Sequence, residues 1–435
     1  MRILRHHSKH MDILITRVWL DGRKANIAIE GNRIARITFG EEPFYPEAQV
    51  IDGDNMAVIP SFVNGHTHAA MTLLRGYADD MPLDVWLKTK IWPREARLTP
   101  EMIYHGNRLA CLEMIKSGTT SFVDMYFRRK EGVRAAEEMG LRSDQPCLLM
   151  DFFDPDRAAA VQREAEEAYH NALGESTSGL TQFALAAHSV YAVSADSLRW
   201  IGRFSEKYQL PVHIHLSETE AEVADAIKNF GKSPVRYLAD LGFLSPRVIA
   251  AHALWLSPED IDILAEYNVK VVHNPASNLK LASGYRFLYN ELRDKGVCVG
   301  LGTDGCSSSN NLDMMEAMKL AALMQKAWRA DSSALPAAEV FAMATAHGGA
   351  IMNRHLGVIE EGALADLALI RLNEPAFTPN FHFVSNLVYS GNSSCVDTVI
   401  CNGRILMRGR VVPGEEEILA QANETAHRLV ADDPA

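Results

Sequence analysis

The chain has 435 residues, of which 47% are hydrophobic, and its formal net charge at pH 7 is −12. A chain of this length can bury one large core and a smaller second one. The negative balance argues against nucleic acid or an anionic membrane surface as a partner, and it favours a protein that acts on small molecules.

Cysteine content and the N-terminus bear on the compartment. The six cysteines form no Cys-x-x-Cys pair, so we expect reduced thiols rather than a disulfide framework. No apolar run approaches the ~20 residues of a membrane helix. Residues 1–10, MRILRHHSKH, lack the apolar segment of a signal peptide, and Met11 is a second candidate for the start of the mature chain. A cytoplasmic location is therefore expected.

Both ends of the chain are predicted to be rich in antiparallel strands. In residues 1–60, DILITRVWLDG and KANIAIEGNRIARITFG alternate apolar and polar positions, and Gly22, Gly31 and Gly40 mark turns. The same style returns near the other end, in GALADLALIRL and VDTVICNGRILMRGRVV. We predict that residues 1–60 and 365–435 form one small β-sandwich domain, to which the second segment adds a terminal helix.

Residues 61–364 alternate short apolar strands with amphipathic helices, which is the pattern of a parallel sheet. Helix starts are marked at Thr99 and Ser257, where a capping residue precedes a proline at the first helical position. Eight such units in about 300 residues favour a (β/α)8 TIM-like catalytic barrel. The eight candidate strands end near His68 or lie in TTSFVDMY, PCLLMDFF, TQFALAAHSV, LPVHIHLSE, RVIAAHALWL, VKVVHNPASN and VCVGLGTDG.

Polar residues stand close to the C-terminal ends of these strands. In a (β/α)8 barrel, active sites are built at that edge. Buried polar groups there cost desolvation energy unless they are paired or bind something, so a ring of them indicates a site. The residues are His66 and His68, Asp124, Asp151, His188, His215 with Glu218, His252, His273 and Asp304.

The stretch His66-Thr67-His68 places two imidazoles on one face of a strand, because residues i and i+2 point the same way. Two neutral imidazoles suit zinc or another divalent ion. An isolated pair of this kind is more often two partly exposed histidines than a metal site. Here, further His and Asp residues at the ends of later strands favour the metal site. In the second pair, His215 lies nearer the edge, and His213 is expected to be a core histidine.

Three further residues have both a chemical and a structural interpretation. Glu218 is either a proton shuttle or the carboxylate that precedes a helix N-terminus. Asp304, in LGTDG, is either a metal ligand that accepts a proton from water or an ordinary turn aspartate. His252, in IAAHALWL, is either a residue that polarises water or a core histidine.

The order HTHAAMTLLRGYADDMPLDVWLKTKIWPREARLT, HLSE, AAHA, HNPASNLKLASG and LGTDG resembles the amidohydrolase superfamily. More closely, it is similar to the 5′-methylthioadenosine/S-adenosylhomocysteine deaminase-like family. The resemblance covers nearly the whole chain, including the β-rich ends, which that superfamily pairs into one small domain. It implies an enzyme, a hydrolase acting on C–N bonds of cyclic amidines.

The resemblance also implies a cofactor and a site. The cofactor is one zinc ion per subunit, with Fe²⁺ or Mn²⁺ as alternatives. The implied metal ligands are His66, His68, His215 and Asp304. The implied catalytic residues are Glu218 as the acid/base group, with His252 and Asp304 holding the attacking water. The implied substrate contacts are Glu95 at the ribose hydroxyls, Trp86 near the base, His188 and Glu218.

The implied reaction is hydrolytic deamination of an adenosine-type nucleoside to the inosine product and ammonia. The candidate substrates are 5′-methylthioadenosine, S-adenosylhomocysteine, 5′-deoxyadenosine and adenosine, and a homo-oligomer is expected. One alternative is a deaminase or chlorohydrolase of a free base or s-triazine on the same scaffold, for which the ribose carboxylate Glu95 has no use. A second is a non-catalytic metal-binding protein, which we expect to have lost a ligand.

One departure from the family pattern concerns the substrate. Relatives that bind the homocysteine carboxylate place an arginine where this chain has Cys147. Arg142 and Arg157 are the candidates to replace it. We therefore expect S-adenosylhomocysteine to be a poorer substrate than the other nucleosides.

Overall fold

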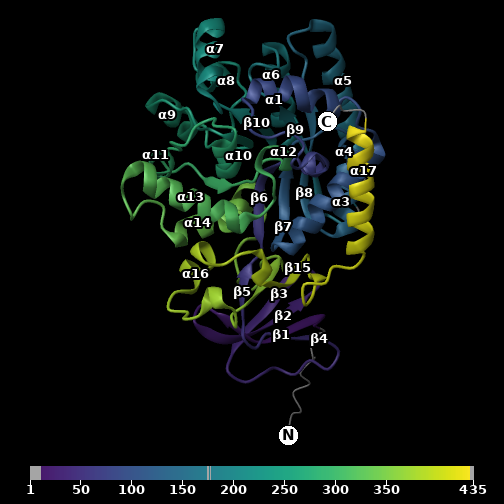
Figure 1. The fold of residues 1–435 in the computed structure, drawn as a ribbon, viewed down its shortest axis with the longest axis vertical. Helices are drawn as coiled ribbons and strands as arrows, with labels where there is room; N and C mark the ends of the chain where they lie inside the picture. Colours follow the sequence, from purple (N-terminus) through teal and green to yellow (C-terminus); the bar gives the residue numbers. More distant parts are fainter. Residues whose placement is uncertain (1–10, 174–175, 177, 432–435) are drawn as a thin grey trace.

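The computed structural model of the protein describes residues 11–173, 176 and 178–431, so the predictions made for residues 1–10 lie outside the described residues. Two eight-stranded sheets organise the described chain. One is a barrel wrapped in helices, and the other, here called the small sheet after the small domain predicted from the chain ends, lies below it (Figure 1).

The sheet of β6 to β13 is a parallel barrel, as the sequence predicts. Its strands follow one another in chain order, and the first and last strands lie in contact, so that the sheet nearly closes. The strands are β6 (Phe62–Thr67), β7 (Thr119–Asp124), β8 (Arg142–Leu149), β9 (Thr181–Ala187), β10 (Val212–Leu216), β11 (Val248–His252), β12 (Lys270–His273) and β13 (Val299–Leu301).

Most helices of the barrel pack around the outside of its strands. Two of them begin at the capping residues that the sequence predicts. The Thr99 side chain accepts a hydrogen bond from the Met102 amide, and Ser257 forms a capping box with Asp260. The longer helices are α3 (Pro100–Lys116), α4 (Arg129–Met139), α5 (Pro155–Ala172), α6 (Ala195–Tyr208), α7 (Glu220–Phe230), α8 (Pro234–Asp240), α9 (Pro258–Glu266), α13 (Met314–Arg329), α14 (Ala337–Ala344) and α16 (Phe383–Tyr389).

Short helical pieces fill the connections. Several of them follow the C-terminal ends of barrel strands, where they surround the predicted site. They are η1 (Ala69–Leu74), α1 (Leu83–Trp86), η2 (Leu87–Ile91), α2 (Trp92–Glu95), α10 (Pro275–Lys280), α11 (Tyr289–Asp294), α12 (Cys306–Ser309), α15 (Ala346–Ile351), η3 (Pro375–Phe377) and η4 (Ser393–Cys395).

The small sheet joins strands from the two ends of the chain, as predicted. Strand β5 pairs with β14 in an antiparallel ladder, and inward-facing aliphatic residues from both ends form one separate core. Its strands are β1 (Ile13–Leu20), β2 (Arg23–Glu30), β3 (Arg33–Phe39), β4 (Gln49–Asp52), β5 (Met56–Pro60), β14 (Leu367–Arg371), β15 (Val396–Cys401) and β16 (Arg404–Met407). The division into domains at residues 60/61 and 364/365 remains a prediction.

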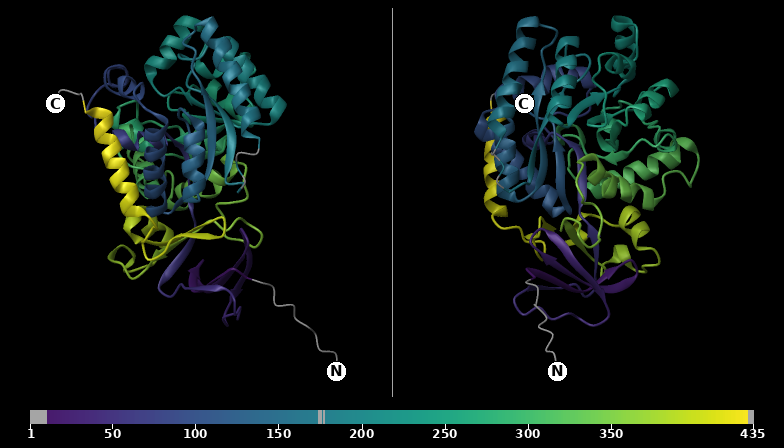
Figure 2. Two further views of the ribbon diagram at one scale, coloured as in Figure 1. Left: turned by 90° about the vertical axis from the view of Figure 1, so that its right-hand side faces the viewer. Right: turned by 180° about the vertical axis from the view of Figure 1, so that it is seen from behind.

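The last helix, α17 (Glu415–Val430), leaves the small sheet and runs beside α3 along the barrel (Figure 2). It buries Ala422 and Leu429 in an apolar cluster shared with the region around η1. The chain therefore crosses between the sheet and the barrel at the link from β5 to β6, again from α15 to β14, and once more at this helix.

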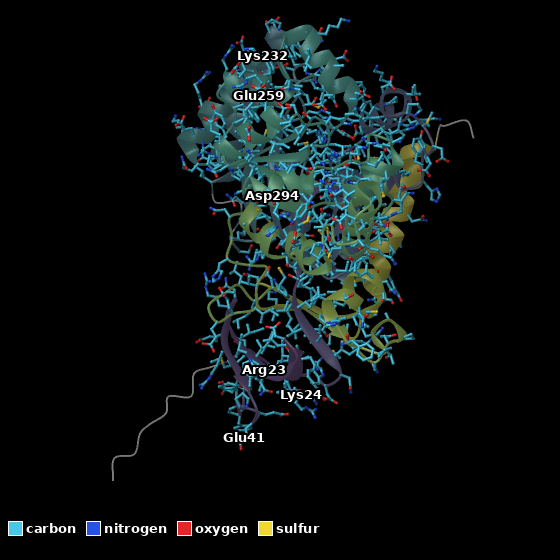
Figure 3. The ribbon with its side chains drawn as sticks, turned by 90° about the vertical axis from the view of Figure 1, so that its left-hand side faces the viewer. Arg23, Lys24, Glu41, Lys232, Glu259 and Asp294 are labelled. Carbon is cyan, nitrogen blue, oxygen red and sulfur yellow. The ribbon has the colours of Figure 1, made fainter. Side chains whose placement is uncertain are left out.

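Charged side chains lie mainly on the outside of the molecule. Figure 3 labels six of them, at the small sheet and along the helical barrel. Within the described part of the chain, no helix is both long enough and apolar enough to cross a membrane. The six labelled residues are Arg23, Lys24, Glu41, Lys232, Glu259 and Asp294.

Strand β8 begins earlier than the sequence suggests. The prediction placed the strand at PCLLMDFF, whereas it starts at Arg142 and runs through Pro146. The preceding residues look like a polar loop, yet Arg142 is buried and bonded at 2.8 Å to the Asp366 carboxylate from the other end of the chain. Arg142 therefore stands at the sheet-facing end of the barrel, far from the strand ends that carry the predicted site.

Replacing Arg142 by methionine is expected to lower the free energy of unfolding by about 3–5 kcal/mol, because the buried Asp366 carboxylate is left without its cation. Chemical denaturation followed by circular dichroism measures the loss. The exposed pair of Arg199 and Asp196 provides the control, and Arg199→Met is expected to cost less than about 1 kcal/mol. Equal effects of the two changes contradict this account of β8.

Candidate active site

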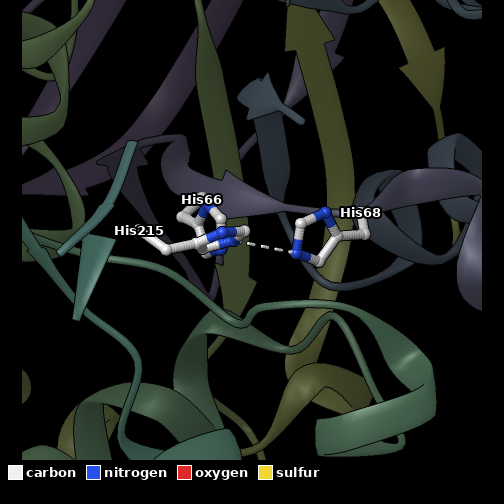
Figure 4. Close-up of side chains that lie close together, drawn as sticks. All are labelled: His66, His68 and His215. Atoms are coloured by element: carbon white, nitrogen blue, oxygen red, sulfur yellow. Dashed lines mark hydrogen bonds between the residues drawn. The ribbon is translucent and has the colours of Figure 1, made fainter. Parts of the chain in front are cut away.

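The four predicted metal ligands come together at the C-terminal end of the barrel. Nitrogen atoms of His66, His68 and His215 lie within 4.8 Å of one another (Figure 4). The Asp304 Oδ1 atom lies 3.4 Å from His66 Nε2 and 3.1 Å from His68 Nε2. They are brought together by the neighbouring ends of β6 and β13 and by β10.

The hydrogen bonds of these histidines suit a cation. His68 Nδ1 donates to the Met125 carbonyl, and His215 Nδ1 donates to the His188 carbonyl at 2.9 Å. The proton of a neutral imidazole is thereby placed on Nδ1, and the lone pair on Nε2. The two Nε2 atoms nevertheless face each other at 3.3 Å, the contact drawn as a dashed line in Figure 4. A shared cation relieves the repulsion between two lone pairs.

His66 completes the donor set. It is fully buried, and its Nε2 atom has no hydrogen-bond partner among the described residues. Its Nδ1 atom lies 3.0 Å from Nε2 of His213, which is buried one layer deeper, as expected. A buried nitrogen without a hydrogen bond is costly, and here the Asp304 Oδ1 atom lies 3.4 Å away without forming one, so a cation bound between them would satisfy both atoms. Three imidazoles and one carboxylate are a ligand set typical of a divalent transition metal.

The Asp304 carboxylate is held ionised. Burial raises the pKa of this carboxyl, but the neighbouring His66 and His68 rings lower it well below its usual range. The residue adopts a left-handed backbone with φ of 61°, a conformation that is uncommon outside glycine and that aspartate and asparagine adopt more readily than other residues. Such strain is found at functional sites, where the surrounding structure enforces it.

Glu218 lies beside the ligand cluster. Burial and the neighbouring charge of Asp304 raise the pKa of its carboxyl to about 8. Its Oε2 atom is 3.7 Å from His252 Nε2. A carboxyl group with this pKa can carry a proton near neutral pH, as a group that delivers a proton to a substrate must.

Glu218 does not cap the helix that follows it. That role belongs to Thr219, whose side chain accepts a hydrogen bond from the Glu222 amide. The Glu222 carboxylate in turn accepts the backbone amides of Ser217 at 2.9 Å and Glu218 at 2.8 Å. The sequence analysis missed Glu222, which here holds the strained turn that carries Glu218, since Ser217 has φ of 50°.

The remaining predicted residues line one pocket with this cluster. The pocket is lined by His68, His215, Asp304, Glu218, His252, Trp86, Glu95 and His188. His66 is wholly buried behind it. Glu95 is half-buried at the end of α2, and its carboxylate accepts the Tyr126 hydroxyl at 2.7 Å. Lining residues that the sequence analysis did not name include Met71, Trp92, Tyr126, Phe127, Leu148, Met150 and Tyr191.

Three strand-end residues of the sequence analysis have structural roles instead. Asp124 accepts the amides of Ala69 and Met125, and so fixes the turn after β6. Asp151 binds the amide and the hydroxyl of Ser194. The buried His273 ring stacks on a phenylalanine ring. Within the described residues, none of these three side chains lines the pocket.

Cys147, which stands where relatives have the carboxylate-binding arginine, and the candidate replacement Arg157 lie next to this pocket. Cys147 and Arg157 line a groove that shares Glu95, Tyr126 and other walls with it. Arg157 is exposed, and its guanidinium lies over the Phe152 ring at 4.9 Å. Arg142 is excluded, because its side chain is bound to Asp366 at the other end of the barrel.

The fold and the site together define a barrel hydrolase that uses a metal cofactor. A model of the Amidohydrolase family matches residues 57–406. The chain belongs to this family, as the sequence motifs indicate.

Sequence similarity to known proteins extends over most of the chain. A 5′-deoxyadenosine deaminase of Methanospirillum hungatei is 47% identical over 381 residues, which are 88% of this chain and 85% of that protein. A 5-methylthioadenosine/S-adenosylhomocysteine deaminase of Archaeoglobus fulgidus is 45% identical over 409 residues, 93% and 95% of the two chains. A solved adenosine deaminase of Xanthomonas campestris with bound zinc has a TM-score of 0.88 and 31% identity, over 97% and 99% of the two chains.

Proposed function

We propose that the protein is a zinc-dependent deaminase of adenosine-type nucleosides, which converts them to the inosine product and ammonia. The observation that best supports this proposal is a single pocket. It contains the His/Asp ligand cluster, the buried acid Glu218 and, further out, the carboxylate Glu95. The relatives named above act on this class of substrate according to their names.

A zinc ion bound by His66, His68, His215 and Asp304 would supply a water activated for attack at neutral pH. His252 and the Asp304 carboxylate orient that water toward C6 of the adenine ring. Glu218 gives a proton to the adjacent ring nitrogen, because its raised pKa lets it carry one. Asp304 takes one proton of the water and passes it to the amino group, which leaves as ammonia, and the hydroxyl added at C6 returns its proton to Glu218 and stays as the carbonyl oxygen.

The outer part of the pocket orients the nucleoside. Glu95 accepts hydrogen bonds from the two ribose hydroxyls, and these charge-assisted bonds position the base. Trp86 is buried in the pocket wall, with its indole N–H bonded to the Ala78 carbonyl at 3.0 Å, and offers a flat apolar surface to the base. His188 lies next to His215, with ring centres 4.8 Å apart, and contacts the substrate from that side.

Changing Glu95 to glutamine is expected to lower kcat/KM for 5′-deoxyadenosine about 10- to 100-fold, mainly through KM, because a neutral amide binds the ribose diol less strongly. Steady-state kinetics of the two proteins give the ratio. The exposed Glu101→Gln is the matched control and is expected to leave kcat/KM unchanged. An unchanged KM in the Glu95 variant would mean that the ribose binds elsewhere.

We expect the choice among nucleosides to depend on the 5′ substituent. 5′-Methylthioadenosine and 5′-deoxyadenosine are expected to be better substrates than S-adenosylhomocysteine, because Cys147 offers no positive charge to the homocysteine carboxylate. A comparison of kcat/KM values, followed by ultraviolet absorbance, tests this. Efficient use of S-adenosylhomocysteine would show that another group, with Arg157 the first candidate, binds the carboxylate.

Two parts of this proposal concern properties other than the reaction. A homo-oligomer in solution remains a prediction, and light scattering at several protein concentrations tests it. Zinc, rather than Fe²⁺ or Mn²⁺, is proposed from the nitrogen-rich ligand set, and metal analysis of the purified protein tests that choice.

A further inference from the structure

Residues 277–283, here called the bracing segment, span the end of α10 and the turn that follows it. Each of three polar side chains in this segment contacts a different candidate catalytic residue. All three are buried. The contacts are Ser277 with Asp304, Asn278 with His252, and Ser283 with Glu218.

The first contact concerns the rotation of the Asp304 carboxylate. The Ser277 hydroxyl donates to Oδ2 at 2.6 Å, whereas Oδ1 faces the Nε2 atoms of His66 and His68. The Gly305 amide donates to Oδ1 at 2.9 Å, so the two bonds together hold the carboxylate against rotation about its Cβ–Cγ bond. Ser277 therefore helps to keep one oxygen directed at the ligand cluster and the other at the pocket.

The second contact concerns the tautomer of His252. The Asn278 side-chain amide donates to Nδ1 at 2.9 Å, so that nitrogen carries the lone pair. The proton of the neutral ring is then on Nε2, which lies 3.7 Å from Glu218 and 3.9 Å from Asp304. His252 thus presents an N–H group to the pocket. It can hold the oxygen of a water molecule but cannot take that water's proton.

The third contact concerns the Glu218 carboxylate. The Ser283 hydroxyl donates to Oε1 at 3.3 Å and leaves Oε2 on the His252 side. The Ser283 carbonyl accepts the indole N–H of Trp255 at 2.7 Å. The Trp255 amide itself binds the Ser217 carbonyl at 2.9 Å, next to Glu218 in the chain. The segment is therefore tied to the same turn that carries the acid.

We propose that the bracing segment is a single positioning element, which fixes the rotation of Asp304, the tautomer of His252 and the orientation of Glu218. This inference rests on the proposed function and assigns Ser277, Asn278 and Ser283 as positioning residues. Its mechanistic consequence is that His252 acts as a hydrogen-bond donor, so proton transfer falls to the carboxylates.

The tautomer is tested directly by nuclear magnetic resonance on protein in which the histidines carry ¹⁵N. Long-range ¹H–¹⁵N spectra distinguish a protonated ring nitrogen from an unprotonated one, and the His252→Gln spectrum assigns the signals. The expected result is a proton on Nε2 and none on Nδ1. Changing Asn278 to aspartate, which can only accept, is expected to move a proton onto Nδ1. Native protein with its proton on Nδ1 alone would overturn the proposal.

Kinetics provide a second test of Asn278. We expect Asn278→Leu to lower kcat about tenfold or more, with KM changed less than about threefold and metal content unchanged, since only the donor to the water is disturbed. Asn229→Leu, on the exposed side of α7, is the control and is expected to behave as the native protein. Native kcat in Asn278→Leu, together with native metal content, would contradict the assignment.

Substitutions of the two serines distinguish an effect on metal binding from an effect on the acid Glu218. Ser277→Ala is expected to weaken metal binding about 10-fold or more in a competition with a chelator, whereas Ser277→Thr restores it. Ser283→Ala is expected to lower kcat about threefold to tenfold with unchanged metal affinity. Ser277→Ala with native metal affinity, or a Ser283→Ala loss that appears only in KM, would contradict the proposal.

These outcomes are distinguishable from failure of the proposed function. If the native, metal-loaded protein converts no adenosine-type nucleoside, the reaction assignment fails, while the tautomer and the metal competition still report on the bracing segment. If the native protein is active and the variants behave as the native protein does, the segment has no positioning role.

Discussion

Glu218→Gln is expected to lower kcat about 10²- to 10⁴-fold while the protein keeps its metal, because glutamine has the same shape but cannot deliver a proton. The buried carboxyl has a pKa raised to about 8, so the native side chain can be protonated at neutral pH. Steady-state kinetics with 5′-deoxyadenosine, alongside metal analysis of the same preparation, measure the effect.

The control for this change stands two residues further along the chain. Glu220 is exposed at the start of α7, and Glu220→Gln is expected to have native kcat. A Glu218 variant that keeps more than about a third of native kcat would contradict its role as the acid, since general acid catalysis contributes far more. The Ser283 contact would then serve only to pack the pocket.

Removing the metal with a chelator is expected to lower activity at least about a thousandfold, and added Zn²⁺ is expected to restore it. Mg²⁺ should not, because a site with three imidazoles suits a borderline metal better than a hard cation. Removal should also lower the thermal midpoint of unfolding, since a ligand that binds only the folded chain stabilises it.

His215→Ala tests the same cluster by substitution. We expect this variant to lose metal and activity together, because one of the three imidazoles is gone. His170→Ala, on the exposed face of α5, is expected to change neither. Full activity in metal-free native protein, or a His215 variant that is active and contains no metal, would contradict the metal assignment.

Part of the candidate metal cluster was predictable from local pattern, and the full ligand set was implied by the family resemblance. His66 and His68 share a strand face by the two-residue repeat, and His215 and Asp304 follow later strands whose ends meet at one edge. The barrel was predictable for a similar reason, since apolar strands and capped helices alternate along the chain. Neither inference requires knowledge of which distant residues touch.

The start of β8 and the place of Arg142 were not predictable from local pattern. A run of charged and polar residues reads as a loop unless the partner of each charge is known. Here Arg142 is satisfied by Asp366, which is more than 200 residues away in the sequence. Asp144 in the same run is also buried, and it lies 3.9 Å from Arg354. Burial of paired charges is a property of the tertiary fold.

The supporting contacts of the site were missed for the same reason. Serine and asparagine residues are common in loops and carry no pattern of their own. The sequence therefore indicates no role for Ser277, Asn278 and Ser283, although they lie in the family motif HNPASNLKLASG. Conversely, Asp124 and His273 looked like site residues because they stand at strand ends. A position at the C-terminal end of a barrel strand identifies a candidate site residue. Which of these side chains face the pocket becomes clear only from their hydrogen-bond partners in the fold.

The most direct test of the central claim is ammonia release from 5′-deoxyadenosine by the zinc-loaded protein. The proposal predicts one ammonia and one inosine-type product for each nucleoside consumed, with a rate that reaches its maximum at one zinc ion per chain. The contradicting result is no ammonia from any adenosine-type nucleoside at full zinc occupancy, while a free base or an s-triazine is converted.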